Sequence, residues 1–159
     1  MSTVDSENHI IICRFIGLTS TMQLVQELRQ DPSTEDTPVV IIDEFLDEQL
    51  TPRLGDVPLP GTLVGAGGTP VFLSRILKER DDLSADEIES MRLPLSEIQV
   101  LTDRLWQMSL ADRCELHGLP SNRADVILIG AAIYEAVMMR CGFSELRPTL
   151  RGVRYGALL

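Results

Sequence analysis

The chain has few of the residues from which metal sites and disulfide frameworks are built. Its 159 residues include three cysteines and two histidines. Cys13, Cys114 and Cys141 lie far apart without a CxxC pair, which argues against a disulfide framework or a zinc site and favours thiols in the core. His9 and His117 are isolated, and no carboxylate cluster at ligand spacing accompanies either one. We therefore expect no metal site in this chain alone.

Long apolar runs are also lacking. No run is long enough to cross a bilayer, and the beginning "MSTVDSENH" lacks the basic, apolar and small-residue order of a signal peptide. The sequence thus predicts a cytoplasmic protein without membrane contact. Hydrophobic residues make up 44% of the chain and charged residues 24%, as in a soluble globular protein, and the length suits one domain over residues 1–159.

Lysine is almost absent, because Lys78 is the only one among 14 basic residues. With 24 acidic residues the formal net charge is -10, a field that repels polyanions, so we expect no nucleic-acid partner. The thirteen arginines nevertheless suit bidentate recognition of carboxylate or phosphate. The alternative is that each arginine pairs with a surface carboxylate. A local arginine pocket is compatible with an acidic total.

The first third of the chain predicts one strand and two helices. "HIIICRFIG", residues 9–17, is typical of a buried strand, and "STMQLVQELRQ", residues 20–30, of an amphipathic helix. A second helix is expected through "VVIIDEFLDEQL", residues 39–50, although "VVII" equally suits the start of a strand. Proline and glycine then indicate a loop over residues 51–61.

A strand, a glycine turn and a helix follow in that order. "TLVGAGG" predicts a buried strand that ends in glycines, and "TPVFLSRILKER" a helix opened by Thr69 with Pro70 at its first position. Such a junction presents backbone N–H groups to an anion. It lacks the lysine of a P-loop and the second half of a dinucleotide fingerprint, so a purely structural turn is the alternative.

The remainder alternates between helix and strand. A helix is expected from about Ser96, and a short capped helix that stops at Gly118. Residues 126–142 predict a close-packed helix, with a strand over residues 126–129 as the alternative, and the tail predicts a strand and a short final helix. The buried face of the helix from Ser96 is expected to consist of Ile98, Leu101, Leu105 and Met108. The pattern indicates a mixed α/β domain.

Three motifs occur in an order that resembles one known family. They are "GAGGT", "GLPSNRADVILIGAAI" and the closing "GVRYGALL". Over residues 62–159 the chain resembles the C-terminal half of the Ppx/GppA family of exopolyphosphatases and guanosine-pentaphosphate phosphohydrolases. The resemblance implies the second actin-like ATPase domain of that family. The implied fold is a partial ribonuclease H-like domain of the actin/sugar-kinase/Hsp70 superfamily, a mixed sheet flanked by helices.

The resemblance also implies a site. The glycine turn matches the superfamily's adenosine turn, which faces a cleft near the phosphate-bearing substrate. Arg123 and Asp125 match the "RAD" that opens the long helix behind it, where we expect a buried ion pair between them or a helix-end contact, with a phosphate contact as the alternative. Gly130 and Ala131 match a close-packing segment. The candidate phosphate- or nucleotide-binding residues are Gly65, Gly67, Gly68, Thr69 and Arg123.

The family's two phosphate loops, "DxGSNS" and "DIGGGSTE", do not occur in this sequence, nor does the histidine-glycine pair expected near "SMRLPLSE". The family's catalytic glutamate belongs to the first domain. We therefore expect no catalytic residue here, and Mg²⁺ only in an active site completed by a first domain. The expected partner is then a phosphorylated substrate, polyphosphate or guanosine pentaphosphate. The alternatives are a non-catalytic remnant that binds a phosphate, a nucleotide or a protein, and a homo-oligomer or a pair with a separate chain.

Overall fold

A computed structural model describes residues 2–5, 10–13, 39–41 and 62–152 of the chain. By its internal contacts the chain divides into two compact units, Met1–Val57 and Pro58–Leu159. The range that best matches the family motifs lies in the second unit. The expectation of one domain over residues 1–159 stays a prediction, because this division concerns compactness and not independent folding.

The first unit contains a three-stranded sheet in the order β1-β2-β3. Strand β1, Ser2–Asp5, is antiparallel to β2, Ile10–Cys13, and β3, Val39–Ile41, is parallel to β2. Strand β2 confirms the described part of the strand expected over residues 9–17. At β3 the alternative of a strand is confirmed and the helix expected from residue 39 is wrong, because three consecutive β-branched residues favour an extended backbone. The rest of that helix and the one at residues 20–30 lie outside the described residues.

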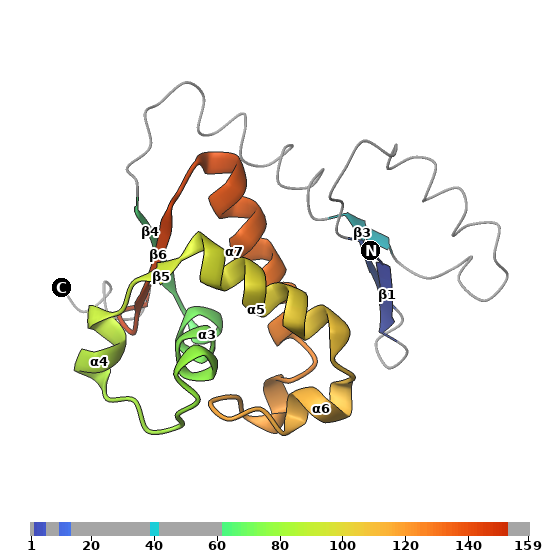
Figure 1. The fold of residues 1–159 in the computed structure, drawn as a ribbon, viewed down its shortest axis with the longest axis horizontal. Helices are drawn as coiled ribbons and strands as arrows, with labels where there is room; N and C mark the ends of the chain where they lie inside the picture. Colours follow the sequence, from blue (N-terminus) through green and yellow to red (C-terminus); the bar gives the residue numbers. More distant parts are fainter. Residues whose placement is uncertain (1, 6–9, 14–38, 42–61, 153–159) are drawn as a thin grey trace, which may run out of the picture. The chain divides into compact units, whose positions relative to one another are not determined.

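The second unit is built on a sheet with the order β4-β6-β5 (Figure 1). Strand β4, Thr62–Ala66, is parallel to β6, Glu145–Thr149, and β5, Leu93–Pro94, is antiparallel to β6. Because two parallel neighbours need a crossover, the described helices of this unit lie between β4 and β6 in the sequence. The short final helix expected in the tail lies outside the described residues. The strands expected at "TLVGA" and in the tail are confirmed.

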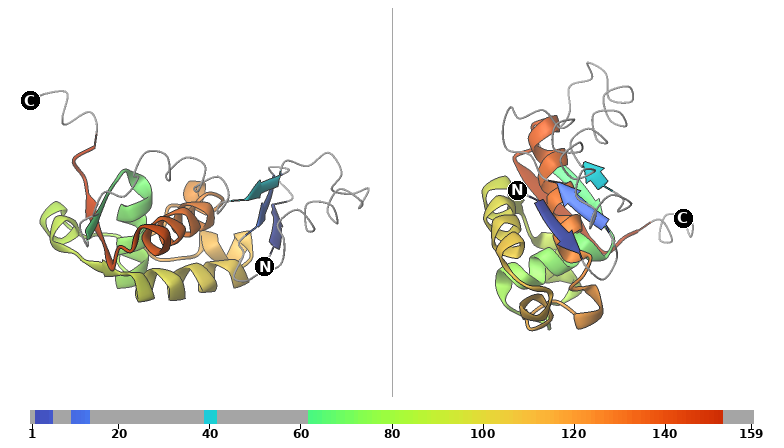
Figure 2. Two further views of the ribbon diagram at one scale, coloured as in Figure 1. Left: turned by 90° about the horizontal axis from the view of Figure 1, so that it is seen from above. Right: turned by 90° about the vertical axis from the view of Figure 1, so that its right-hand side faces the viewer.

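The two faces of this sheet differ in burial. Gly65 on β4 and Leu146 on β6 are buried, whereas Val64 is 60% exposed and its β6 neighbour Arg147 is exposed. Strand β4 is therefore buried on one face only, which corrects the expectation of a buried strand. Helix α3, Gly68–Lys78, packs against β6 and β4 and connects the sheet to the remaining helices (Figure 2).

The helices begin and end where local chemistry dictates. Helix α3 begins at Gly68, before the predicted start, and Pro70 takes its third position, where no backbone N–H is needed. The short helix expected up to Gly118 ends earlier, and Gly118 instead adopts φ +87 in the turn that follows. The remaining elements are α4 at Ala85–Ser90, α5 at Leu95–Gln107, α6 at Leu110–Cys114, the 3-10 turn η1 at Ser121–Arg123, and α7 at Ile127–Cys141. Helix α7 shows that the alternative of a strand over residues 126–129 was wrong.

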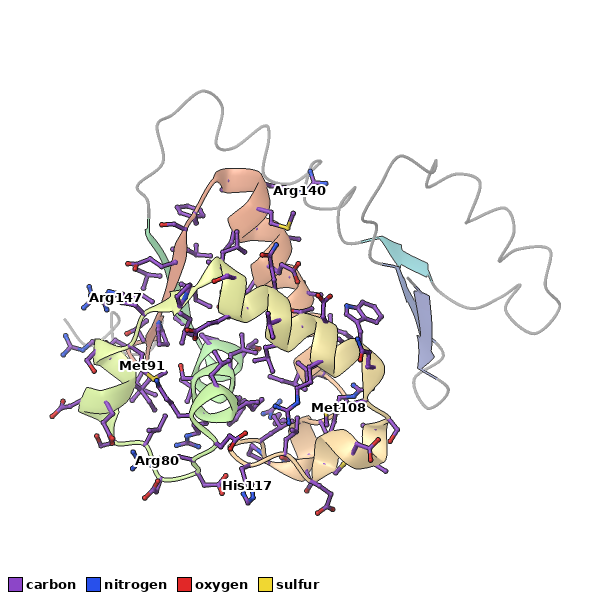
Figure 3. The ribbon with its side chains drawn as sticks, viewed as in Figure 1. Arg80, Met91, Met108, His117, Arg140 and Arg147 are labelled. Carbon is purple, nitrogen blue, oxygen red and sulfur yellow. The ribbon has the colours of Figure 1, made fainter. Side chains whose placement is uncertain are left out.

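The core of the second unit lies between α3, α5, α7 and β6. Ile98, Leu101 and Leu105 on α5 are buried as expected, while Met108 is half-buried at the helix end. A smaller cluster joins α3 to α4 through Val71, Leu83 and Ile88, against which Met91 packs (Figure 3). Cys114 and Cys141 are free and only partly buried, so these two are not the core thiols that the sequence predicted.

None of the helices in the described part of the chain is long and apolar enough to cross a membrane.

Candidate anion-binding site

The turn between β4 and α3 depends on one glycine for its backbone. Gly67 is the N-cap of α3 and has φ 107 and ψ -171, a conformation that is essentially restricted to glycine. It is exposed, and a Cβ built there would meet nothing within 4 Å, so conformation and not space requires glycine. Gly68 and Thr69 follow as the first two residues of α3.

Gly65 has a different role, because it lies inside the fold. A Cβ at this position would lie 2.9 Å from Leu146 Cδ1. It would also lie 3.0 Å from Tyr134 Cε1 and 3.0 Å from the Tyr134 hydroxyl oxygen. The glycine therefore allows the side chains of β6 and α7 to approach β4. Tyr134 is partly buried, and this burial raises the pKa of its hydroxyl.

The start of α7 meets the start of α3 through a second close approach. A Cβ at Gly130 would lie 2.6 Å from Thr69 Cγ2 and 2.8 Å from Thr69 Oγ1. Only a residue without a side chain permits this distance, as the close-packing segment in the sequence predicts. The first turns of two helices that are far apart in the sequence thus lie side by side.

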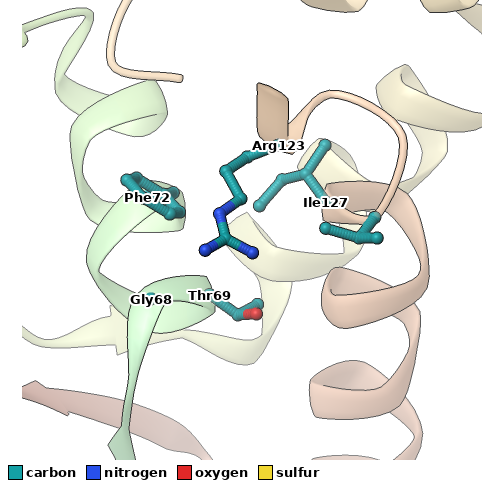
Figure 4. Close-up of a pocket in the computed structure, with 6 residues that line it drawn as sticks. Gly68, Thr69, Phe72, Arg123 and Ile127 are labelled. Atoms are coloured by element: carbon teal, nitrogen blue, oxygen red, sulfur yellow. The ribbon is translucent and has the colours of Figure 1, made fainter. Parts of the chain in front are cut away.

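A pocket of about 140 Å³ opens where these two helix starts meet. Its lining consists of Gly68, Thr69, Phe72, Arg123, Val126 and Ile127. Figure 4 shows Arg123 extending between Phe72 and Ile127, with its guanidinium group directed toward Gly68 and Thr69. Of the five candidate residues, Gly68, Thr69 and Arg123 are brought together here, and Gly65 and Gly67 do not line the pocket.

The buried ion pair expected between Arg123 and Asp125 is not present. Arg123 is exposed and has neither a salt bridge nor a hydrogen bond from its side chain within the described residues. Asp125 Oδ1 instead accepts a hydrogen bond from the backbone N–H of Val126 at 2.9 Å. The short aspartate side chain turns back to its own backbone, which leaves the longer arginine side chain free to reach the pocket.

Two helix starts and one cationic side chain border the pocket. The starts of α3 and α7 both face it, and neither helix has a side-chain cap on its first-turn N–H groups. Each start carries a positive partial charge from the helix dipole, and the guanidinium group of Arg123 adds a full one. No carboxylate is among the lining residues, although the Asp125 carboxylate lies next to them and accepts from the Val126 N–H. This arrangement favours an anion with several oxygen atoms.

The Mg²⁺ expected for a complete active site finds no ligand set in the part of the chain that the structure describes. No group of three or more His, Cys, Asp or Glu side chains lies close enough together there to hold a metal ion. These residues alone therefore do not fit a metal centre.

The sequence profile of the Ppx/GppA phosphatase family matches residues 7–159. The chain belongs to this family. Exopolyphosphatase 2 from two strains of Mycobacterium tuberculosis is 27% identical to this Ppx/GppA chain over 158 residues, which cover 95% of the chain and 49% of the relative. The chain thus spans about half the length of the curated relatives that it matches.

Solved structures show the same fold. An Aquifex aeolicus member of the Ppx/GppA family superposes with a TM-score of 0.65 at 24% identity, over 86% of this chain and 44% of that one. An exopolyphosphatase from Cytophaga hutchinsonii superposes with a TM-score of 0.61 at 21% identity, over 74% and 39%. This Ppx/GppA chain therefore has the predicted mixed α/β fold of the actin-like ATPase type, with a small mixed sheet flanked by helices.

Three lining residues of the pocket were missed from the sequence: Phe72, Val126 and Ile127. Phe72 follows Thr69 by three residues on α3, so the helical period already places both on one face. Val126 and Ile127 directly follow the "RAD" motif. The sequence signal for these three residues is therefore their position within one helical turn after each motif.

Proposed function

We propose that this chain provides one wall of a phosphate-binding cleft in a phosphohydrolase of the Ppx/GppA type. The substrate is the terminal phosphate of polyphosphate or of guanosine pentaphosphate. The opposite wall, with the two phosphate loops and the catalytic glutamate, comes from a first domain on a separate chain or segment. Family membership supports the relation to phosphohydrolases, and the chain corresponds to about half of its curated relatives.

One observation carries this proposal. The starts of α3 and α7, both without side-chain caps, meet at a single pocket together with Arg123, which has no salt bridge among the described residues. The chain as a whole has a net charge of -10, so a local group of positively charged and polarised groups is better explained by the binding of a specific anion than by the general character of the surface.

The chemistry assigned to this chain is binding and orientation. The guanidinium group of Arg123 and the backbone N–H groups of Gly68 and Thr69 hold phosphate oxygens and neutralise their charge. Positioning and charge stabilisation account for most of the catalysis of phosphoryl transfer, but they act only when the nucleophile is held as well. Because this sequence contains neither phosphate loop, we propose that it is inactive alone.

The test compares Arg123→Gln with Arg104→Gln. Arg104 is an exposed arginine of α5 without a hydrogen bond or ion pair in the described structure, so its replacement removes the same charge from elsewhere. By isothermal calorimetry we expect the wild type to bind tripolyphosphate and Arg123→Gln to bind it about tenfold or more weakly, because a charge-assisted contact is lost. Arg104→Gln should retain nearly the wild-type affinity. Equal losses in both variants would refute a specific pocket.

A second arm of this test measures phosphate release from polyphosphate and from guanosine pentaphosphate. The chain is assayed alone and mixed with a polypeptide that carries the family's two phosphate loops. Turnover only in the mixture supports the proposal, whereas binding without turnover in any mixture supports the alternative of a non-catalytic phosphate- or nucleotide-binding remnant. If the chain binds no phosphate compound, a protein-interaction role is left.

A further inference from the structure

Arg123 reaches the pocket from a turn that has little regular structure of its own. The turn η1 spans three residues and is closed by backbone hydrogen bonds from Arg123 N–H to Pro120 O, at 2.8 Å, and from Ala124 N–H to Ser121 O, at 3.2 Å. Short 3-10 turns have strained hydrogen-bond geometry and add little stability by themselves. Because the Arg123 side chain has no polar partner in the described structure, the turn alone determines where this side chain begins.

Helix α6 holds this turn in place. Arg113 Nη1 donates a hydrogen bond to the carbonyl oxygen of Ala124 at 3.1 Å. Ala124 is fully buried and directly follows Arg123. The next residue of α6, Cys114, places its Sγ 3.9 Å from the carbonyl oxygen of Ser121, at the other end of the turn. Consecutive residues of α6 therefore contact both ends of η1.

Arg113 is itself well anchored. Its backbone N–H donates to Ser109 O at 3.0 Å, and the Ser109 hydroxyl accepts from the Asp112 backbone N–H at 3.1 Å, which fixes the start of α6. The Arg113 side chain is partly buried, and its Nε is buried without a hydrogen-bond partner. Burying a guanidinium group for a single carbonyl contact costs free energy, so stability alone is a poor reason for an arginine at this position.

We infer that Arg113 is a positioning residue for the anion pocket: by holding the carbonyl of Ala124, it fixes the turn from which Arg123 reaches the bound phosphate. The inference rests on the proposed function of that pocket. It assigns Arg113 no contact with the ligand, and its effect on binding passes through Arg123.

A double-mutant cycle on tripolyphosphate binding tests this dependence. Arg113→Met keeps the aliphatic stem and removes the donor, and we expect it to weaken tripolyphosphate binding about tenfold. In the Arg123→Gln background the same change should alter the affinity less than about twofold, because the residue that it positions is already absent. Arg113→Lys, which keeps a cationic donor, should restore part of the affinity. Equal losses in both backgrounds would overturn the inference.

Amide hydrogen exchange on the full chain tests the positioning without a ligand. In Arg113→Met we expect faster exchange of the Arg123 and Ala124 amides, and unchanged exchange at Leu73 and Ile76 in the core of α3. Arg104→Gln is the matched control and should change neither set. If the wild type binds no tripolyphosphate, the proposed function fails, and this measurement alone decides whether Arg113 holds the turn. Equal acceleration in both sets, or in neither, contradicts the inference.

Discussion

At the scale of single residues, the glycines around the β4–α3 junction serve different physical needs. Gly67 provides a backbone conformation that other residues avoid. Gly65 and Gly130 provide space, the first for Leu146 and Tyr134 and the second for Thr69. Only the structure separates these needs, because a glycine required for conformation and one required for space look alike in a sequence.

Gly130→Ala should destabilise the second unit by about 1–3 kcal/mol, as overpacking typically does. The new Cβ would lie 2.6 Å from Thr69 Cγ2, and the β-branched Thr69 on a helix has little rotamer freedom with which to move away. Urea unfolding of the variant and the wild type measures the change.

Two further variants test whether the loss of stability comes from the contact between Gly130 and Thr69. Gly152→Ala is the control, since a Cβ at Gly152 would meet nothing within 4 Å. Thr69→Ser removes the clashing methyl group and should recover part of the lost stability when combined with Gly130→Ala. A Gly130→Ala variant as stable as the wild type would show that α3 and α7 do not pack as closely as described.

At the scale of the elements, the helices differ in how the N–H groups at their starts are satisfied. Helices α4 and α6 have complete capping boxes, Ser84 with Glu87 and Ser109 with Asp112. Helices α3 and α7 have no side-chain cap, and both start at the pocket. Helix α5 also has no side-chain cap, although it does not start at the pocket: its N-cap is Pro94, and the Leu95 N–H donates to the carbonyl oxygen of Ser144. An uncapped start is therefore compatible with the candidate site but does not by itself identify it.

The capping box of α4 makes stability depend on pH. The Ser84 backbone N–H and hydroxyl, together with Arg80, lower the pKa of Glu87 from 4.5 to about 2 in the folded chain. A depressed folded-state pKa gives stability that is present above pH 4.5 and is lost as the pH falls from 4.5 toward 2. Glu87→Gln keeps the capping geometry but removes this titration, so its unfolding free energy should fall less between about pH 6 and about pH 3.

Denaturant unfolding at both pH values measures this difference. Glu97→Gln is the matched control, since Glu97 is an exposed first-turn glutamate of α5 whose carboxylate accepts no hydrogen bond in the described structure. It should retain the pH dependence of the wild type. A Glu87→Gln variant with an unchanged pH dependence would contradict the assigned role of the carboxylate.

At the scale of the whole molecule, a positive pocket is carried on a chain with a net charge of -10. The overall field repels a polyphosphate at long range, while the attraction that we propose for the pocket acts only near contact. Raising the ionic strength from about 10 mM to about 150 mM shortens the screening length from about 30 Å to about 8 Å, which weakens the long-range repulsion most. The association rate of tripolyphosphate should therefore rise with salt, as stopped-flow measurements can determine. A rate that falls with salt would mean that the pocket's own field dominates the approach.

The sequence alone predicted most of what local chemistry controls. Repeating apolar positions gave α5 and its buried residues, and the β-branched or glycine-ended runs gave β2 and β4. At Val39–Ile41 it favoured a helix and left a strand as the alternative, which the structure confirms, because helix and strand patterns overlap over a few residues. The range at residues 20–30 is not described. Three ordered motifs were enough to indicate the family, because glycines at fixed spacing encode a specific chain path.

The tertiary structure decided what depends on contacts between distant segments. The sequence placed Arg123 beside Asp125 and favoured an ion pair, yet the fold brings Arg123 over the first turn of α3, more than 50 residues away in the chain. It also showed that Gly65 packs inside and that Phe72 lines the pocket. Local patterns determine where helices and strands begin, but which of their ends meet is set by the packing of the whole unit, and the candidate site exists only where two such ends come together.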